Sequence, residues 1–510
     1  MVRVNQLKMG SILSYVQMAI QIVIGVLYTP LMIRLLGQSD YGLYNTVAST
    51  ISMISILNLG FSSGYIKFYS IYKARDEQEQ ISRLNGLYFI VFSILGAIAL
   101  LCGLFLTFNL RLVFENGLTS TEYSTARVLM LLLTVNLTVS FPMNVFHCII
   151  SSQERFVFLK TVGMVRTVLT PLLTIPVLLL GYGSIGLVTI SVLLSFIVDS
   201  AYVFYVLVVL HSRFLFGNNE KGLFVELFKY TSFIAINIVT DQINWNVDKF
   251  ILGRYCGTVI VAVYSVGATL QSYYQMFSLA VSNVFIPRIH KIVNKNGITE
   301  AQRYSELTDV FIKVGRIQYS VLALIISGFV FFGREFITIW AGNGYEDSYV
   351  VALLLMIPVT IPLIQNIGTE IQRALNKHQL RSVIYLFMAL LNLLITIILC
   401  QKYGAIGAAL GTTISLVLST GIIMNLLYYF VLHIDVIKFW INIGRMTVGL
   451  IIPIMVGIIM KYIIAISHAT VLIICILVYT LIYAVSFFFL GMNQYERNIF
   501  GEPLKRLVRL

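Results

Sequence analysis

Charge is scarce in this chain of 510 residues. Only 11% of the residues are Asp, Glu, Lys or Arg, whereas 58% are hydrophobic and the mean hydropathy is +0.89. A soluble protein would have to expose much of that apolar surface, so a lipid bilayer is the expected solvent. The first apolar run, 10–33, is long enough to span a bilayer and leads straight into a second run, so we expect no cleaved signal peptide.

Cysteine and the common catalytic motifs are equally sparse. The five cysteines are odd in number, scattered and mostly within apolar runs, a pattern that indicates neither a disulfide framework nor a zinc site. The chain has no Walker A lysine loop and no GxSxG, so we expect neither ATP hydrolysis nor serine-nucleophile catalysis. These absences predict a protein that is not an enzyme and that has no cofactor and no metal site.

Long apolar runs are what the sequence has in abundance. Runs close to the 20 residues that cross a bilayer as a helix recur along the whole chain. We predict an all-α polytopic membrane protein with about fourteen spans, at 10–33, 45–66, 85–108, 128–150, 158–180, 186–210, 230–251, 259–287, 317–340, 349–372, 382–400, 406–432, 446–465 and 469–490. No loop exceeds about 30 residues, and the longest is the basic loop 288–316, so no large domain outside the membrane is expected.

The basic residues predict the orientation of these spans. The net charge of +13 could suggest nucleic acid, but the Lys and Arg residues lie in short loops between apolar runs. Most of them fall on one side when both termini are placed in the cytoplasm, as the positive-inside rule requires. We therefore expect a multi-pass membrane protein with N- and C-termini cytoplasmic, and no binding of nucleic acid.

An internal repeat organises the chain into two halves. Four pairs match in order with offsets of 216 to 221: Leu36-Gly37 with Leu252-Gly253, Tyr44 with Tyr264, Pro142 with Pro362, and YGSIG at 182–186 with YGAIG at 403–407. Two homologous bundles of six spans would have the same orientation, with a site between them near mid-membrane. The predicted division is an N-lobe at 1–215, a C-lobe at 216–435, and two extra spans with a basic tail at 436–510.

Polar residues recur at helical spacing on four of these apolar spans. They are Gln17, Gln21 and Tyr28 on the first span, Ser55, Asn58 and Ser62 on the second, Asn237, Asp241, Asn244 and Asp248 on the seventh, and Gln271, Gln275, Ser278 and Ser282 on the eighth. Steps of three and four residues place each set on one face of its helix. Under the repeat offsets the sets overlie one another, so we expect the four faces to point at a common place.

Two interpretations of these faces remain open. The residues can be packing contacts between helices, each amide satisfied by a neighbour, or they can line a water-filled cavity. Two carboxylates together with amides and hydroxyls favour the cavity. The candidate substrate and ion contacts are Gln21, Tyr28, Arg34, Asn58, Arg166, Asn237, Asp241, Asn244, Asp248, Lys249, Gln271 and Gln275. Arg166 either lines the cavity or pairs with Glu370, and Arg34, Lys249 and Arg254 are either interfacial cations or phosphate contacts.

Five stretches resemble a known family. RLLGQSDYGLY at 34–44, SQERF at 152–156, DKFILG at 248–253, ALNK at 374–377 and YGAIGAAL at 403–410 are similar to the polysaccharide flippases of the multidrug/oligosaccharidyl-lipid/polysaccharide exporter superfamily. The resemblance implies two six-helix lobes that translocate undecaprenyl-pyrophosphate-linked oligosaccharide repeat units across the bacterial plasma membrane by alternating access, coupled to H⁺ or Na⁺. It also implies lipid-linked oligosaccharide and membrane lipids as partners, a polysaccharide polymerase and glycosyltransferases as neighbours in the pathway, and a monomer.

The acidic seventh span keeps other functions open, because a pyrophosphate-sugar cavity should contain cations. A cation-coupled multidrug exporter or a lipid II flippase of the same superfamily is the main alternative. A membrane glycosyltransferase or polymerase is a distant one, since no large outer loop and no loop carboxylate set for sugar nucleotides is evident.

Overall fold

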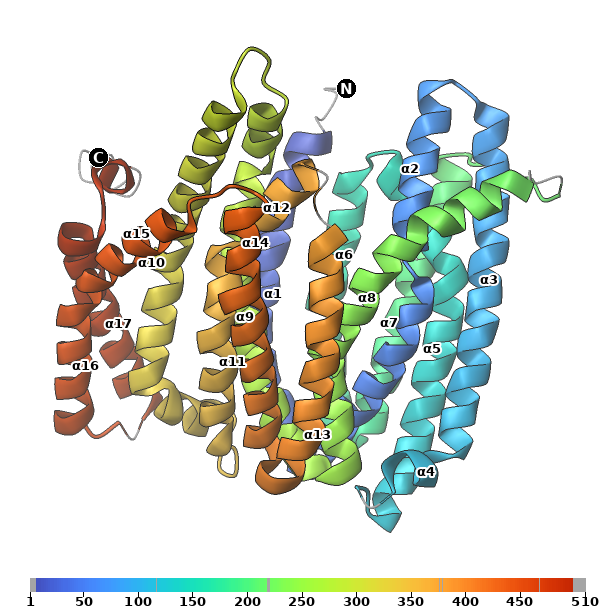
Figure 1. Ribbon diagram of the computed structural model, residues 1–510. Helices are drawn as coiled ribbons and strands as arrows, with labels where there is room; N and C mark the ends of the chain where they lie inside the picture. The colour runs from blue at the N-terminus through green and yellow to red at the C-terminus, as the bar shows by residue number, and fades with distance from the viewer. Residues whose placement is uncertain are drawn as a thin grey trace, which may run out of the picture. The chain divides into compact units, whose positions relative to one another are not determined.

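The protein, described here by a computed structural model, is built from helices joined by short turns (Figure 1). The structure describes residues 6–115, 117–217, 221–375, 377, 379–466 and 468–498. Each of the fourteen predicted spans falls on one helix or on consecutive helical segments. The predicted basic tail, with Lys505, Arg506 and Arg509, lies outside the described residues.

The helix lengths agree with the predicted number of spans. Ten helical stretches of the described residues are long and apolar enough to cross a membrane. Two of them, Met9–Ala74 with 66 residues and Gln379–Phe430 with 52, are each long enough to cross twice. The 35-residue helix α8 (Lys221–Tyr255) and the 36-residue helix α9 (Thr258–Val293) supply the seventh and eighth spans. These two helices are not among the ten apolar stretches, because their polar faces lower their hydropathy. Their length alone is sufficient to cross a membrane.

The chain forms two compact units, each held together by its own contacts. Unit 1 comprises residues 1–265 and 393–404, and unit 2 comprises residues 266–392 and 405–510. Helix α8 is thus grouped with the first six spans. The lobe boundaries at 215 and 435, which came from the sequence repeat, stay a prediction.

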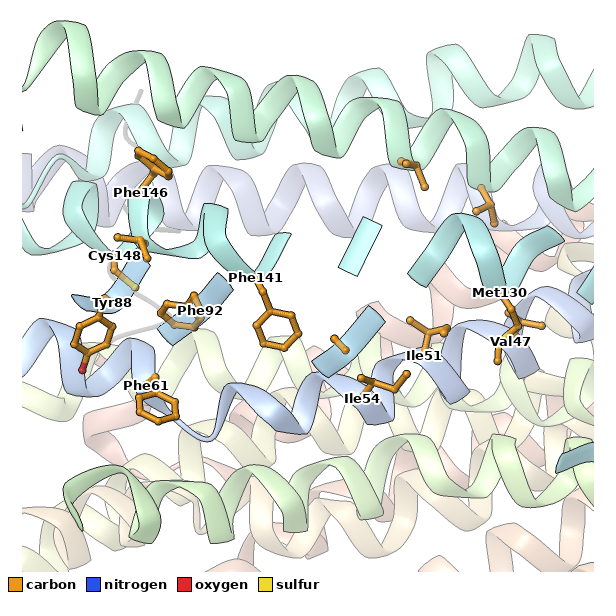
Figure 2. Close-up of a cluster of buried hydrophobic side chains, with 14 of the residues drawn as sticks. Val47, Ile51, Ile54, Phe61, Tyr88, Phe92, Met130, Phe141, Phe146 and Cys148 are labelled. Carbon is orange, nitrogen blue, oxygen red and sulfur yellow. The ribbon is translucent and has the colours of Figure 1, made fainter. Parts of the chain in front are cut away.

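Unit 1 contains the helices of the first seven spans. They are α1 (Gln6–Ile54), η1 (Ser55–Asn58), α2 (Phe61–Ala74), α3 (Gln78–Phe108), α4 (Leu110–Phe114), α5 (Ser120–Ser152), α6 (Phe156–Leu179), α7 (Gly183–Phe204), η2 (Tyr205–Val209) and α8. Helix α1 packs along α6 and α8, while α3 packs along α5 and α5 along α7. The core between α1, α2, α3 and α5 is apolar and aromatic, with Phe61, Tyr88 and Phe92 in edge contacts (Figure 2).

Unit 2 contains the remaining spans, apart from 258–265 of α9 and 393–404 of α13, which belong to unit 1. After α9 they are α10 (Glu300–Trp340), α11 (Asp347–Ile364), α12 (Asn366–Ala374), α13 (Gln379–Leu416), η3 (Val417–Ile423), α14 (Met424–Phe430), α15 (Val436–Thr447), η4 (Val448–Leu450), α16 (Ile451–Ile463), α17 (Ala469–Ser486) and η5 (Phe487–Gly491). Helix α10 is the centre of this unit, because α11, α15, α16 and α17 all pack against it. The two extra spans, α16 and α17, are therefore attached through α10.

The predicted long loop 288–316 is mostly helix. Helix α9 continues to Val293, and α10 begins after a capping box in which Thr299 accepts from the Gln302 backbone N–H while the Gln302 side chain accepts from that of Thr299. Arg316, expected at the end of that loop, instead lies inside α10 and is buried. Its guanidinium meets the Glu496 carboxylate through two hydrogen bonds, Nε to Oε1 at 2.6 Å and Nη2 to Oε2 at 2.8 Å.

The backbone turns support the internal repeat and correct one of its alignments. Gly183 and Gly404, which the repeat pairs, have left-handed φ values of 54° and 55° at the start of equivalent spans. Gly37 has φ 76° between the first two spans, but its predicted counterpart Gly253 lies within α8. The corresponding turn is at Gly257, with φ 88°, and 257 − 37 gives the same offset of 220 as the Tyr44 match. The extra four residues of the second hinge therefore lengthen α8 before the turn.

The second span is broken, which the sequence analysis did not anticipate. Leu59 and Gly60 adopt left-handed φ values of 45° and 77°, so the span consists of the end of α1, the short η1 and then α2. A side chain at Gly60 would come within 2.5 Å of Ile234 Cγ2 on α8. Glycine at this position lets the bent span approach α8 closely.

Candidate functional site

The predicted cavity residues are divided between the two units. Ten of the twelve belong to unit 1, in which α1 packs along both α6 and α8. Gln271 and Gln275 on α9 belong to unit 2. The candidate site is therefore the set of polar residues on α1 and α8 of unit 1.

The four polar residues of α8 differ in exposure along the helix. Asn237 and Asp241 are exposed, Asn244 is half-buried, and Asp248 is 2% exposed. The Tyr264 hydroxyl donates a hydrogen bond of 2.6 Å to Asp248 Oδ2. Asp241 is thus the carboxylate that unit 1 presents at its surface, whereas Asp248 joins α8 to the start of α9. An assignment of both carboxylates as direct substrate contacts stays a prediction.

A second polar row on α8 was missed by the sequence analysis. Asn246 Nδ2 donates to Gln242 Oε1 at 2.6 Å, and Gln242 Nε2 donates to Ser55 Oγ at 3.3 Å. These bonds hold η1, and with it the bent second span, against α8. The signal was present, since Gln242 and Asn246 are four residues apart and so lie on one helical face. Asn58, on the same segment, accepts from the Ser62 hydroxyl at 3.4 Å.

Helix α1 carries two residues of the candidate site, a phenol and an amide. The Thr174 hydroxyl of α6 donates to the Tyr28 hydroxyl at 2.8 Å and so holds the ring of Tyr28 in position. Gln21, two helical turns before it, is exposed. Amide, phenol and carboxylate groups on neighbouring helices are donors and acceptors suited to the hydroxyl groups of a sugar or to a hydrated cation.

Arg166 has its own partner within unit 1. Its Nη2 donates to Ser195 Oγ at 2.8 Å, and its charge acts on Asp199, one turn further along α7. Asp199 Oδ2 is buried without a hydrogen-bond partner among the described residues. Glu370, the alternative partner predicted for Arg166, pairs instead with Arg373 of its own helix at 2.7 Å.

Of the three cations predicted as interfacial residues or phosphate contacts, Arg254 holds two helices together. Arg254 donates to the carbonyl oxygens of Leu112 and Val113 at 3.2 and 2.9 Å and pairs with Glu115 at 3.2 Å. It therefore fastens the end of α8 to α4. Arg34 is exposed and Lys249 is half-buried beside Asp248, and the predicted role of both in phosphate binding stays a prediction.

Glu122, in the first turn of α5, was not among the predicted site residues. Its Oε1 accepts from the hydroxyls of Ser39 and Thr258, each at 2.6 Å, and its Oε2 accepts from the backbone N–H of Thr119 at 2.8 Å. One carboxylate thereby joins the turn after the first span, the start of α9 and the start of α5. The T-x-x-E pattern at 119–122 is a capping box that was visible in the sequence.

Part of the α9 face is packing, as the first of the two interpretations expected. Ser278 donates to the Leu363 carbonyl at 2.9 Å, and the fully buried Gln318 donates to both Ser278 Oγ and Ser282 Oγ at 2.9 and 3.0 Å. These serines connect α9 to α10 and α11 inside unit 2. In the part of the chain that the structure describes, no group of three His, Cys, Asp or Glu residues could hold a metal ion.

Comparisons with known proteins agree with this architecture. A family model described as polysaccharide biosynthesis protein matches residues 7–293. The chain is 20% identical to a putative O-antigen transporter of Shigella flexneri over 394 residues, which cover 76% of this chain and 89% of that protein. It is 25% identical over 199 residues to the capsular polysaccharide biosynthesis protein CapF of Staphylococcus aureus, a match that covers 39% of this chain and 48% of CapF.

Solved structures with the same fold are membrane transporters. The lipid II flippase MurJ, in its inward closed conformation, aligns with a TM-score of 0.67 at 16% identity over 97% of this chain and 99% of MurJ. The multidrug transporter DinF-BH aligns with a TM-score of 0.59 at 18% identity over 84% of this chain and 96% of that one. These similarities show the fold, and the family model covers more than half of the sequence. The chain therefore belongs to the polysaccharide biosynthesis protein family.

Proposed function

We propose that this protein is a flippase that moves undecaprenyl-pyrophosphate-linked oligosaccharide repeat units across the bacterial plasma membrane for surface polysaccharide synthesis. The observation that carries the proposal is the family match over residues 7–293, which extends across both α1 and α8. Within that region α1 and α8 pack against each other, and each carries polar groups: an amide and a phenol on α1, and amides and carboxylates on α8. A sugar chain offers many hydroxyl groups, and such side chains can replace the water that those hydroxyls lose inside a membrane.

The names of the relatives support the same substrate class. One is an O-antigen transporter and another a capsular polysaccharide biosynthesis protein. We further propose alternating access driven by H⁺ or Na⁺, with Asp241 as the carboxylate that exchanges between the ion and the substrate. Cytoplasmic termini, as the distribution of Lys and Arg predicts, complete the proposed topology.

Reconstitution tests the substrate. The purified chain is placed in liposomes with an undecaprenyl-pyrophosphate oligosaccharide labelled on the sugar with a fluorophore, and the fraction reached by a membrane-impermeant quencher is followed with time. We expect faster transbilayer movement than in protein-free liposomes, and acceleration by either a proton or a sodium gradient. Transport of the cationic dye rhodamine 6G with no movement of the labelled lipid would refute the proposal and favour a multidrug exporter.

A test in cells separates the substrate from the mechanism. Deletion of the gene should leave lipid-linked repeat units on the cytoplasmic leaflet, because their synthesis continues while their export stops. Complementation by the full-length chain should restore surface polysaccharide. Unchanged surface polysaccharide in the deletion strain would contradict the assignment.

A further inference from the structure

The short helix α15 lies where the chain passes between two membrane spans. Helix α14 ends one apolar stretch at Phe430, and the next stretch, Val436–Ile463, begins with α15 and continues through η4 into α16. Figure 1 shows α15 running obliquely to α16 rather than continuing its direction. An inclined helix at the start of a span, directly after the connection from the preceding span, is expected near the lipid headgroups.

The side chains of α15 form three separate faces. Val436, Phe439, Ile443 and Met446 are buried against the rest of unit 2. A second face is apolar and uncovered, with Ile437 62% exposed and Ile441 50% exposed. The third face carries the exposed cations Lys438 and Arg445, which are seven residues and so about two helical turns apart. At the edge of a bilayer such a helix contacts the protein through its buried face, the acyl chains through its exposed apolar face and the headgroups through its cationic face.

The two cations are available to a ligand. Arg445 makes no hydrogen bond or ion pair with any residue that the structure describes. Lys438 lies 3.3 Å from Asp309, but the two side chains are 54% and 67% exposed, and ion pairs of that kind contribute little. The remaining nearby carboxylate, Asp435, accepts the backbone N–H of Lys438 at 2.8 Å and so serves as the N-cap of α15.

Next to these cations α14 and α15 enclose a groove of about 810 Å³. Its lining residues include the exposed Tyr429 and Phe430 from α14, and Ile437 and Ile441 from α15. Its polar members are His433, Asp435, Lys438, Asn442 and Arg445. An apolar wall beside cations suits an amphiphile with a negative headgroup.

We propose that this groove is a binding site for an anionic glycerophospholipid. The lipid phosphate lies between Lys438 and Arg445, and an acyl chain lies along Phe430, Ile437 and Ile441. A soluble anion would make no use of the apolar wall, and a zwitterionic lipid would gain less from the cations. The bound lipid fixes the elbow between the twelfth and thirteenth spans on the headgroup layer, independently of which substrate is transported.

Trp440 on α15 is a built-in reporter for this site. It is one of three tryptophans, and its indole Nε1 donates to Asn425 Oδ1 at 2.9 Å, which fixes the ring. The full chain with Trp245→Phe and Trp340→Phe is placed in nanodiscs of phosphatidylcholine with a minority of phosphatidylglycerol. Acyl-chain bromine is carried either by the phosphatidylglycerol or by an equal amount of the phosphatidylcholine. Quenching of Trp440 then measures how far each lipid is enriched beside α15.

We expect phosphatidylglycerol to be enriched about fivefold over its bulk fraction, which is the effect of one Lys or Arg close to an anionic membrane surface. Lys438→Gln with Arg445→Gln should abolish the enrichment, whereas the matched pair Arg288→Gln with Lys291→Gln, two exposed cations at the end of α9, should preserve it. If the chain with Trp245→Phe and Trp340→Phe does not fold, the quenching of Trp440 can be obtained by difference. The quenching of the Trp440→Phe variant is then subtracted from that of the chain with all three tryptophans.

Three results would overturn the proposal. Equal quenching by both brominated lipids would show no preference for the anionic headgroup. Enrichment that survives the loss of both cations would place its cause elsewhere. Loss of enrichment on adding inorganic phosphate, with no loss at the same ionic strength of chloride, would identify a site for a free anion rather than for a lipid. None of these results bears on the proposed transport function, which the liposome assay tests separately.

Discussion

The buried ion pair between Arg316 and Glu496 leads to a prediction that can be worked through quantitatively. The side chains are only 6% and 2% exposed, and two hydrogen bonds join them. Arg316 also donates to the carbonyl oxygens of Asn442 and Gly491 at 3.1 and 3.2 Å, so it links α10 to α15 and to the segment after η5. Glu496→Gln keeps the shape of the side chain but removes its charge, and leaves a buried guanidinium without a counter-ion.

The expected cost is large because the remaining charge cannot reach water. Removing one partner of a buried pair typically costs about 3–5 kcal/mol. If the segment around Glu496 opens locally, its open population should rise roughly a hundredfold or more, since each 1.36 kcal/mol is a factor of ten. Amide hydrogen exchange measured by mass spectrometry on a peptide covering residues 488–498 reports that population directly.

Two further variants test the reasoning. Glu306→Gln breaks the exposed pair with Lys295, whose nitrogen and oxygen are 2.7 Å apart, and should change stability by less than about 1 kcal/mol. Arg316→Met combined with Glu496→Leu should recover much of the loss, because an apolar pair leaves no uncompensated charge. Exchange in Glu496→Gln that is no faster than in the unaltered chain would refute the argument, as would a double variant less stable than the single one.

Other predictions concern the turns and the polar faces of unit 1. Gly42→Ala should lower the free energy of unfolding by about 1–3 kcal/mol, because a Cβ there would fall 1.8 Å from the carbonyl oxygen of Thr258 at the start of α9. Thermal unfolding measures the effect, and Gly444→Ala, whose Cβ would meet nothing within 4 Å, is the control. Glu122→Gln should weaken three hydrogen bonds and lower the unfolding temperature, and an unchanged temperature would contradict its joining role. Asp241→Asn should reduce transport in liposomes with normal membrane insertion, whereas Asp248→Asn should reduce both stability and transport; full transport by Asp241→Asn would remove that carboxylate from the proposed mechanism.

The sequence was sufficient for the spans and the duplication because both depend on local patterns. Apolar length identified the helices, and the paired YG motifs fall where the structure has turns, at Gly183 and Gly404, with nearly equal φ. The hinge alignment failed by four residues because Leu-Gly pairs are frequent in such a chain. The turn itself requires a left-handed residue, which in the second copy is Gly257.

The partners of the polar residues were beyond sequence reasoning. Spacing predicted that Asp241 and Asp248 share a helical face, but not that Tyr264 would cover one of them. Likewise Arg316 was expected in a loop, since a single basic residue at the edge of an apolar run does not reveal a partner 180 positions away. Long-range pairing depends on tertiary packing, and a pattern of period 3.6 contains no information about it.

The separation of Arg316 from Glu496 in the sequence imposes an order on the folding of the chain during its synthesis. A ribosome adding roughly 5–20 residues per second needs on the order of ten to forty seconds to proceed from the arginine to the glutamate. During that interval α10, around which unit 2 is packed, holds a cation whose counter-ion has not yet been synthesised. Unit 2 can therefore reach its final packing only after the last span has emerged, and until then the nascent chain depends on water, lipid headgroups or the insertion machinery to shelter that charge.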